Sequence, residues 1–474
     1  MPVPSLIKIK HIVVLMFENR SFDHMCGWFG CGDGLGPGAF NLEDPSDAGS
    51  PAVPANRDAA YVGDLTIEPG HAFLDVNEQL FANVVEPDPP IATNSGFVWN
   101  YARRPGNTLA GAHRVMNAFD RAKLPVLSTL ASEFVLCDRW FASVPGQTWP
   151  NRFFTHAATS GGFADNQFRD YQFHTIYHLL DREHRDWAIY FHDFPHAYTI
   201  ASMRTPKFAP HFRFAKQFFL DLKHGRLPAY SFIEPRYFDF LRWKANDLHP
   251  PHDVRLGEHL IADVYEALHS SSAWDSSLFV VLFDEHGGLY DHVPPPAAIN
   301  PDGKTSSNPP FRFDRLGPRV PAVVISPWVQ KGFVDSTVFD HTSLIASARE
   351  LFQLRGPLTE RDRAAATITH LLQAGPRTDT PGVLKRPPEP TADAFHADGA
   401  KAAMTAEHVA ADLATGTASS APLSEFQRSL VEAAHSLQAS QPRRAGVVSR
   451  ARLVDNEHEG AVYVRELAAR LFEP

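Results

Sequence analysis

The sequence predicts an α/β protein in which helices cover both faces of a central, mostly parallel β-sheet. Short apolar runs that end in polar residues recur along the chain, as is typical of buried parallel strands. Segments with helical spacing of apolar residues alternate with these runs, and this alternation favours an open α/β sheet. The composition, with 44% hydrophobic and 21% charged residues, is that of a globular protein with a large core.

Six apolar runs are the candidate strands of this sheet: residues 9–17, 134–137, 187–191, 230–233, 277–283 and 320–326. The first run stops at Glu18-Asn19, and the fifth stops at Asp284-Glu285. Open α/β sheets bind their ligands beyond the carboxyl ends of the strands. We therefore expect these two polar pairs to lie at the ligand-binding edge of the sheet.

Two segments that alternate with the candidate strands are expected to be helices. Residues 254–269 carry a narrow apolar stripe, which is formed by Leu256, Leu260, Ile261, Val264 and Leu268. Residues 342–352 are the second candidate, and Asp340 is its expected N-cap.

The chain divides into three regions by composition. Its 474 residues would suffice for about three domains, but one wide sheet explains the pattern over residues 1–375. Pro, Thr, Ala and Asp dominate residues 376–422, so we interpret this region as a poorly ordered, Pro- and Ala-rich linker. Residues 423–474 are expected to form a helical tail, with amphipathic helices near residues 424–437 and 460–472.

Charge and apolar content limit the classes of partner. A net charge of −10 argues against a general nucleic-acid-binding protein. No apolar run approaches the length of about 18 residues that a transmembrane helix needs, and no signal peptide or twin-arginine leader is recognisable. We expect a soluble protein that is cytoplasmic or, if a leader has been removed, secreted or periplasmic. Its oligomeric state stays open.

Cysteine is scarce and histidine is plentiful. Three cysteines cannot form a disulfide framework, although Cys26 and Cys31 are close enough in sequence to close a small loop in an oxidising compartment. Because the chain has 24 histidines, we expect any metal site to use oxygen and nitrogen ligands rather than thiolates.

The two polar pairs at the strand ends are the candidate metal ligands. Glu18 and Asn19 offer two hard oxygen donors to a cation, although the pair could also be a polar turn. Asp284 and Glu285 are costly neighbours unless a cation or hydrogen bonds offset their repulsion. The glycines that follow them also allow a solvated turn. Taken together, the pairs favour a metal site.

A third candidate is Thr148, which lies in the segment GQTWPNR (residues 146–152). A threonine hydroxyl is a weak nucleophile unless a base or a metal lowers its pKa. The local sequence also allows Thr148 to be no more than a helix cap.

Six segments in this order resemble the bacterial phosphoesterase family of phosphatidylcholine-type phospholipases C and acid phosphatases. They are IKHIVVLMFENRSFDH (9–24), EPGHAFLDVNEQ (68–79), GQTWPNR (146–152), LHPPHD (248–253), FVVLFDEHGGLYDHV (279–293) and FDHTS (339–343). The resemblance implies an alkaline-phosphatase-like α/β fold and makes residues 1–375 the phosphoesterase catalytic domain.

Site roles follow from this resemblance, residue by residue. Thr148 would be the nucleophile, and His71 and His249 would face the phosphate or the leaving group. Asn151 would hold a phosphate oxygen, His192 is a looser match for substrate binding, and His341 is interpreted as structural. The metal ligands would be Glu18, Asn19, Asp284 and Glu285.

The implied activity is metal-dependent hydrolysis of phosphodiesters through a phosphothreonine intermediate, with a small phosphoester or a phospholipid as substrate. The main alternative is an acid phosphatase that acts on phosphomonoesters with the same site. The acid phosphatases of the family carry serine where this chain has Thr148, and this difference favours the diesterase. A catalytically inactive binding protein is a further alternative. Oxygen-rich ligation is compatible with Ca, Mg, Mn, Fe or Zn as the divalent metal ion.

Overall fold

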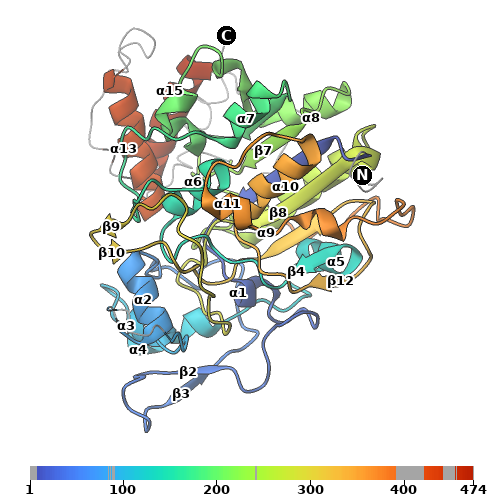
Figure 1. Ribbon diagram of the computed structural model, residues 1–474. Coiled ribbons are helices and arrows are strands. Elements are labelled where there is room, and N and C mark those ends of the chain that lie inside the picture. The colour runs from blue at the N-terminus through green and yellow to red at the C-terminus, as the bar shows by residue number, and fades with distance from the viewer. Residues whose placement is uncertain are drawn as a thin grey trace.

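A computed structural model describes residues 8–83, 85, 87, 91–240, 243–390, 421–440, 454 and 456–472. Within these residues the central sheet has eight strands, in the order β12-β4-β11-β8-β1-β7-β5-β6 (Figure 1). The strands are β1 His11–Phe17, β4 Val135–Cys137, β5 Trp187–Phe191, β6 Phe212–Phe214, β7 Tyr230–Glu234, β8 Ser277–Phe283, β11 Ala322–Ile325 and β12 Phe333–Asp335.

Seven of these strands run in one direction, and β11 alone is reversed. β1 pairs in parallel with β7 and β8, whereas β11 is antiparallel to both β8 and β4. The predicted mostly parallel sheet is therefore confirmed. The apolar run at 320–326 forms a strand as expected, but its direction could not be deduced from its composition.

The register between β1 and β8 brings the ends of these two strands to one level. His11 lies opposite Ser277, and Phe17 lies opposite Phe283. Every residue of β8, and every residue of β1 after His11, is buried. As parallel strands in register end together, the residues that follow them, Glu18 and Asp284, meet at the carboxyl edge.

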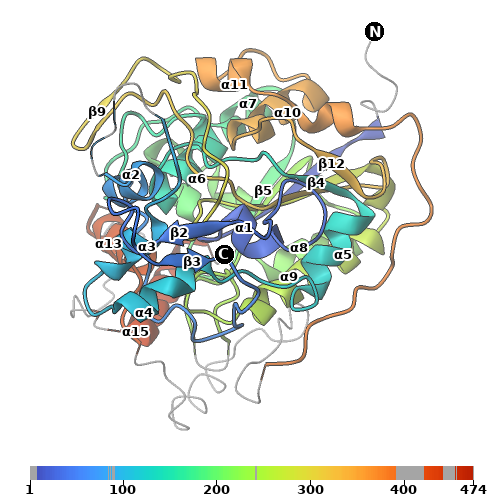
Figure 2. The ribbon, with the colours of Figure 1, turned by 90° about the horizontal axis from the view of Figure 1, so that it is seen from below.

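Helices cover both faces of the sheet, as predicted. Figure 2 shows α6, α7 and α10 on one face and α5, α8 and α9 on the other. These helices are α5 Pro125–Glu133, α6 Thr148–Ala157, α7 Ile176–Arg182, α8 Lys216–Lys223, α9 Val254–His269 and α10 Thr342–Phe352. The predicted bounds of α9 and α10 are confirmed. The N-cap of α10 is His341 rather than Asp340, although the Asp340 carboxylate accepts a bond from the Thr342 amide at 3.0 Å.

Shorter elements surround the carboxyl edge of the sheet. They are α1 Phe22–Cys26, α2 Phe73–Phe81, α3 Phe97–Ala102, α4 Leu109–Ala112, α11 Glu360–Ala364 and the hairpins β2 Phe40–Leu42 with β3 Ala52–Pro54 and β9 Ser306–Ser307 with β10 Pro310–Phe311. Figure 1 shows α2, α3 and α4 grouped at one side of the molecule, below the sheet, with α1 nearer its middle. All three cysteines are free thiols.

The first part of the predicted linker is held on α9. Leu384 is buried, and its amide donates to Glu266 at 2.9 Å. Arg386 pairs with Asp263 and Glu266, both at 2.8 Å. The rest of the predicted linker, residues 391–420, lies outside the described residues.

Two helices, α13 Glu425–Ser440 and α15 Glu457–Phe472, close the chain near the positions predicted for them. They pack on each other, and α13 bonds to α6 through Ser429 and Trp149 (Figure 1). None of the described helices combines the length and the apolar character that crossing a membrane requires.

The buried strands carry the stability of the fold, and a matched pair of leucines tests this. Leu15 lies fully buried in β1, whereas Leu109 is 47% exposed at the start of α4. We expect Leu15→Ala to lower the free energy of unfolding by about 2–5 kcal/mol. Leu109→Ala should change it by less than about 0.5 kcal/mol. Equilibrium denaturation in urea measures both, and equal losses would contradict the assignment of the core.

Candidate active site

The structure brings the four predicted metal ligands together at the ends of β1 and β8. Glu18, Asn19, Asp284 and Glu285 are all buried, with at most 1% of their surface exposed. Asn19 adopts a left-handed conformation with φ 50°, which turns the chain sharply after the strand. Its amide donates to Asp284 Oδ1 at 3.1 Å.

One arginine faces these acids. Arg152, on α6, is fully buried; it binds Glu18 Oε1 and lies 3.3 Å from Asp284 Oδ2. Burial raises the pKa of Glu18 well above its ordinary range in spite of Arg152, and Asp284 adds to the rise. Burial likewise raises the pKa of Asp284 against the pull of Arg152, with Glu285 adding to it. A bound divalent cation would favour the ionised forms of all three acids.

The donor set suits such a cation. Three carboxylates and one amide oxygen are hard ligands, and within the described residues the buried Glu285 Oε1 has no hydrogen-bond partner. The three acids do not, however, belong to the groups whose ligand atoms all lie within 4.8 Å of one another. Arg152 contacts one oxygen each of Glu18 and Asp284, and the carboxyl groups of these two acids also share a hydrogen bond.

Two glycines let the segment after β8 cross its neighbours closely. Gly287 has φ 66°, and a Cβ there would lie 2.2 Å from the Asn19 carbonyl oxygen. Gly288 has φ 70°, and a Cβ there would lie 2.4 Å from the Gly70 carbonyl oxygen. Both positions therefore require glycine for conformation and for space.

Thr148 lies beside the predicted ligands. It is the first residue of α6 and is fully buried, and its hydroxyl donates to Glu18 Oε2 at 3.3 Å and approaches Asn19 Oδ1 at 3.5 Å. The N-cap of α6 is Gln147, so Thr148 does not serve as the helix cap. The position at a helix N-terminus suits an anionic group such as a phosphate.

Asn151 holds the loop that leads into Thr148. Its Oδ1 accepts from the Val144 amide at 3.0 Å, and its Nδ2 donates to the carbonyls of Val144, Gly146 and Gln147 at 3.0–3.2 Å. Its expected contact with a phosphate oxygen stays a prediction, whereas its hold on this loop is a feature of the structure.

His71 and His249 converge on one carboxylate, Glu68. His249 Nε2 lies 3.2 Å and His71 Nε2 lies 3.8 Å from Glu68 Oε1. The Nδ1 atoms of the two histidines contact the backbone carbonyls of Pro69 and Pro250. In each histidine it is therefore Nε2 that is directed toward the site.

The charge on these groups is set by burial and by their neighbours. Burial opposes a charge on His71, but the carboxylates of Glu285, Glu425 and Glu68 outweigh it and raise the pKa of His71 to about 9. Burial also opposes the charge of Glu68, yet His249 and His71 hold its pKa at about 2.

Glu425 reaches this site from α13, the first of the two helices that close the chain. Its Oε1 accepts from Gln147, next to Thr148, and its Oε2 lies 3.9 Å from His71 Nε2. The same helix bonds to the Trp149 indole through Ser429 at 2.8 Å. Residue types and spacing in the tail offered no signal for Glu425, whereas Arg152 and Glu68 lie inside segments that were already recognised.

The two remaining histidines differ in their surroundings. His192 follows β5, and its Nδ1 donates to the Glu234 carbonyl oxygen at 2.8 Å. It lies toward α15, where Arg465 donates to the His192 carbonyl oxygen. Burial lowers the pKa of His192 to about 3. His341 has both ring nitrogens bonded, to Trp140 and to the Asp284 carbonyl, so its interpretation as a structural histidine fits.

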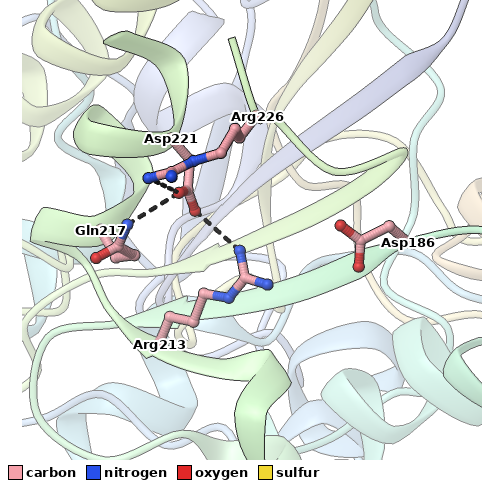
Figure 3. A pocket seen from close by; sticks show the side chains of 5 residues that line it. All are labelled: Asp186, Arg213, Gln217, Asp221 and Arg226. Carbon is pink, nitrogen blue, oxygen red and sulfur yellow. Dashed lines mark hydrogen bonds and ion pairs between the residues drawn. The ribbon is translucent and has the colours of Figure 1, made fainter. Parts of the chain in front are cut away.

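A surface pocket of about 430 Å³ lies elsewhere and contains none of the predicted site residues. Asp186, at its rim, precedes β5, so the pocket lies toward the opposite end of this strand from His192. Figure 3 shows Arg213 and Arg226 both turned toward Asp221, at 2.9 and 3.7 Å. Because these arginines are already paired with an acid, the pocket offers little free positive charge to a phosphate.

Comparison with known families finds that the model of the Phosphoesterase family matches residues 9–355. Non-specific phospholipase C3 of Arabidopsis thaliana is 38% identical over 413 residues, which cover 81% of this chain and 77% of that protein. Non-specific phospholipase C5 of the same plant is 40% identical over 407 residues, 80% of this chain and 77% of its own.

A bacterial relative is more distant. Non-hemolytic phospholipase C of Pseudomonas aeruginosa is 27% identical over 408 residues, which cover 74% of this chain and 55% of that protein. The relatives thus include plant and bacterial proteins, and the bacterial character that the sequence resemblance implied is not confirmed.

Solved structures give weaker similarities. A protein of the alkaline phosphatase superfamily from Vibrio parahaemolyticus aligns with a TM-score of 0.34 and 12% identity, over 52% of this chain and 65% of that one. Phosphonate monoester hydrolase SpPMH from Silicibacter pomeroyi aligns with a TM-score of 0.29 and 11% identity, over 54% of this chain and 73% of that one. At such TM-scores the fold assignment rests on the sheet order and register described above.

The close crossing at Gly287 generates a first prediction for the site. Gly287→Ala should push Asn19 away from Asp284 and weaken the binding of a divalent metal ion by about 10–100-fold, as loss of a supporting contact does. Gly303 is the control, because it also has positive φ (75°) but has no atom within 4 Å of its Cβ position. Calorimetric titration with Mn²⁺ or Zn²⁺ measures the affinities, and an unchanged affinity in Gly287→Ala would contradict the site geometry.

The position of Glu425 generates a second prediction. In protein freed of metal ions with EDTA, Glu425→Gln should lower the pKa of His71 below that of the wild type, since one of three attracting carboxylates is lost. Glu432→Gln, an exposed position on the same helix, should leave it unchanged. Titration of the histidine ring protons by NMR measures these values.

The raised pKa of His71 also determines how the stability of the folded chain changes with pH. The pKa of His71 is raised from its ordinary value of 6.5 to about 9, so its charge stabilises the folded chain fully below pH 6.5. This contribution disappears as the pH rises to about 9. The decline should be smaller in Glu425→Gln than in the wild type, and a steeper decline would contradict the contact.

Proposed function

The chain belongs to the Phosphoesterase family, and from this premise we propose that it hydrolyses phosphodiesters in the manner of a phospholipase C, with Thr148 as nucleophile beside a divalent metal ion. Membership in the family, together with the phospholipase C relatives, makes the chain a hydrolase that acts on phosphoester bonds. We propose three further points: that the substrates are diesters, that a divalent metal ion takes part, and that Thr148 is the nucleophile.

One observation carries the proposal. The Thr148 hydroxyl, at the N-terminus of α6, contacts Glu18 Oε2 at 3.3 Å and Asn19 Oδ1 at 3.5 Å. Thr148 lies 130 positions from Glu18 in the sequence, so the fold itself brings the hydroxyl to the predicted ligands. A nucleophile needs such a neighbour to lose its proton.

Glu18, Asn19, Asp284 and Glu285 would hold the metal ion. When bound, it would lower the pKa of the Thr148 hydroxyl and neutralise charge on the phosphoryl oxygens. Ca, Mg, Mn, Fe and Zn all remain candidates on the chemistry of the ligands.

Each of the residues around the metal ion would then have its own role in the reaction. Thr148 attacks phosphorus in line, the bond from phosphorus to the leaving alcohol breaks, and a phosphothreonine forms. In the structure the hydroxyl donates to Glu18 Oε2, which is therefore placed to receive its proton. His71, with its raised pKa, can supply a proton to the leaving alcohol, and water then hydrolyses the intermediate from the opposite side.

The relatives support diesters, because they are named as phospholipases C. Threonine at position 148 supports the same choice, since the acid phosphatases that the sequence resembles carry serine there. A phospholipid substrate would yield diacylglycerol and a phosphorylated headgroup. An acid phosphatase that acts on monoesters remains the competing activity.

Removal of the Thr148 hydroxyl tests the proposal. Thr148→Ala should lower turnover of p-nitrophenylphosphorylcholine by at least about 10³-fold, as loss of a nucleophile does, while the metal content stays near that of the wild type. Thr155→Ala is the control, because Thr155 is equally buried on α6 but its hydroxyl, within the part of the chain that the structure describes, bonds to Asn151 O and Met16 Sδ and to none of the proposed site residues' side chains. Near-normal rates in Thr148→Ala would refute the assignment, and faster wild-type turnover of p-nitrophenylphosphate would favour the acid phosphatase.

A further inference from the structure

Arg319 lies at the carboxyl edge of the sheet because of the one reversed strand. It precedes β11, which runs antiparallel to β8. The beginning of β11 therefore lies at the edge where β1 and β8 end. The Arg319 side chain is fully buried there, so its charge must be compensated by the groups around it.

The guanidinium binds two aspartates and two carbonyl groups. Nε donates to Asp291 Oδ1 at 2.8 Å, and Nη2 donates to Asp23 Oδ1 at 2.9 Å. Nη1 donates to the carbonyl oxygens of Asp33 and Asp138 at 2.8 and 2.9 Å. Such a planar, multiply bonded guanidinium fixes the relative positions of its partners.

The two aspartates belong to the two segments that carry the proposed metal ligands. Asp23 follows Glu18-Asn19 by a few residues, and Asp291 follows Asp284-Glu285 in the same way. The register of β1 with β8 fixes the start of each segment. Arg319 fixes both segments at a second point, at Asp23 and Asp291, which follow the proposed ligands in the sequence.

Direct bonds between the segments complete this second attachment. The Asp23 amide donates to Asp291 Oδ2 at 3.2 Å, and the His292 amide donates to Asp23 Oδ2 at 2.7 Å. The Ser21 hydroxyl donates to the Tyr290 carbonyl at 2.6 Å. The Arg319 carbonyl itself accepts from the Phe22 amide at 3.1 Å.

The same cluster could be mistaken for a second metal site. Potential ligand atoms of Asp23, Asp291 and His292 lie within 4.8 Å of one another. Arg319 already places a buried positive charge against both aspartates. Within the described residues, all four carboxylate oxygens of Asp23 and Asp291 already accept hydrogen bonds from Arg319 or from backbone amides, whereas Glu285 Oε1 in the proposed metal site has no such partner. We therefore interpret this cluster as an ion-pair network rather than a metal site.

We propose that Arg319 is a positioning residue for the phosphoesterase site: by holding Asp23 and Asp291 together, it fixes the separation of Glu18-Asn19 from Asp284-Glu285. The inference rests on the proposed function, because it takes these four residues as the ligands of the metal ion. Within the described residues, Arg319 forms no hydrogen bond or ion pair with the proposed ligands or with Thr148, and it acts through the two segments.

Metal affinity measures this role without reliance on turnover. Titration of the full chain, freed of metal with EDTA, with Mn²⁺ or Zn²⁺ alone should show an affinity about 10–100-fold weaker in Arg319→Met than in the wild type. Arg319→Lys, which keeps the charge but not the planar contacts, should fall between them. Arg213→Met is the control, since Arg213 lies on the edge strand β6, far from the site, and also pairs with an aspartate, Asp221. The metal affinity of this variant should equal that of the wild type.

Folding is checked on the same samples. If Arg319→Met does not fold, as judged by circular dichroism and thermal unfolding, Asp23→Asn and Asp291→Asn replace it, since each removes one link of the network. Excess metal ion should restore turnover in the folded variants, which a general loss of structure would not allow.

The outcomes separate this inference from the proposed function. A wild type that binds metal, with folded variants that bind it more weakly, supports the positioning role. A wild type that binds metal, with folded variants of equal affinity, overturns the role and leaves the metal site intact. A wild type that binds no metal ion overturns both.

Discussion

The repulsion among three buried carboxylates is the constraint on which the rest of the site depends. β1 and β8 end in register, so Glu18 and Asp284 meet at one level, and Glu285 follows at once. All three side chains are fully buried, and Arg152 supplies one positive charge against them. Buried charges of like sign are tolerated only when a counter-charge or hydrogen bonds offset them. A divalent ion is the counter-charge that this arrangement, with its hard oxygen donors, suits best.

The fold gathers its other functional groups around these acids from distant parts of the chain. The N-terminus of α6 places Thr148 against Glu18 and Asn19. The reversed strand β11 carries Arg319 to the same edge, where it ties the segments after β1 and β8. The C-terminal helix α13 brings Glu425 to His71 and Gln147, although the family match ends at residue 355. The site is therefore built by the sheet, by one helix of its face and by the tail together.

Much of this could be predicted from the sequence, and the failures have physical reasons. The bounds of α9 and α10 follow from apolar stripes of helical period, and the ends of β1 and β8 from apolar runs that stop at acids. The three-residue strands β6 (FRF) and β12 (FVD) each contain a charged residue and so form no apolar run, unlike the equally short β4 (VLC). An apolar run also carries no information about direction, as β11 shows. Glu425 could not be found, because its partner Gln147 lies 278 positions away and only tertiary packing joins them. Asn151 was recognised by its motif, but its bonds to the preceding loop required the structure.

The central claim, that the acids at the ends of β1 and β8 hold a metal ion beside Thr148, is tested most directly by crystallography of the purified protein. Diffraction data collected on both sides of the absorption edge of each candidate transition metal would locate and identify a bound ion, and the coordination distances would reveal calcium or magnesium. We expect one ion bound by Glu18, Asn19, Asp284 and Glu285, the group that Thr148 Oγ1 adjoins in the structure. An ion bound instead by Asp23, Asp291 and His292, or by Asp239, His252 and Glu457, would contradict the claim. So would the absence of any ion among these acids after the crystals are soaked in metal ions.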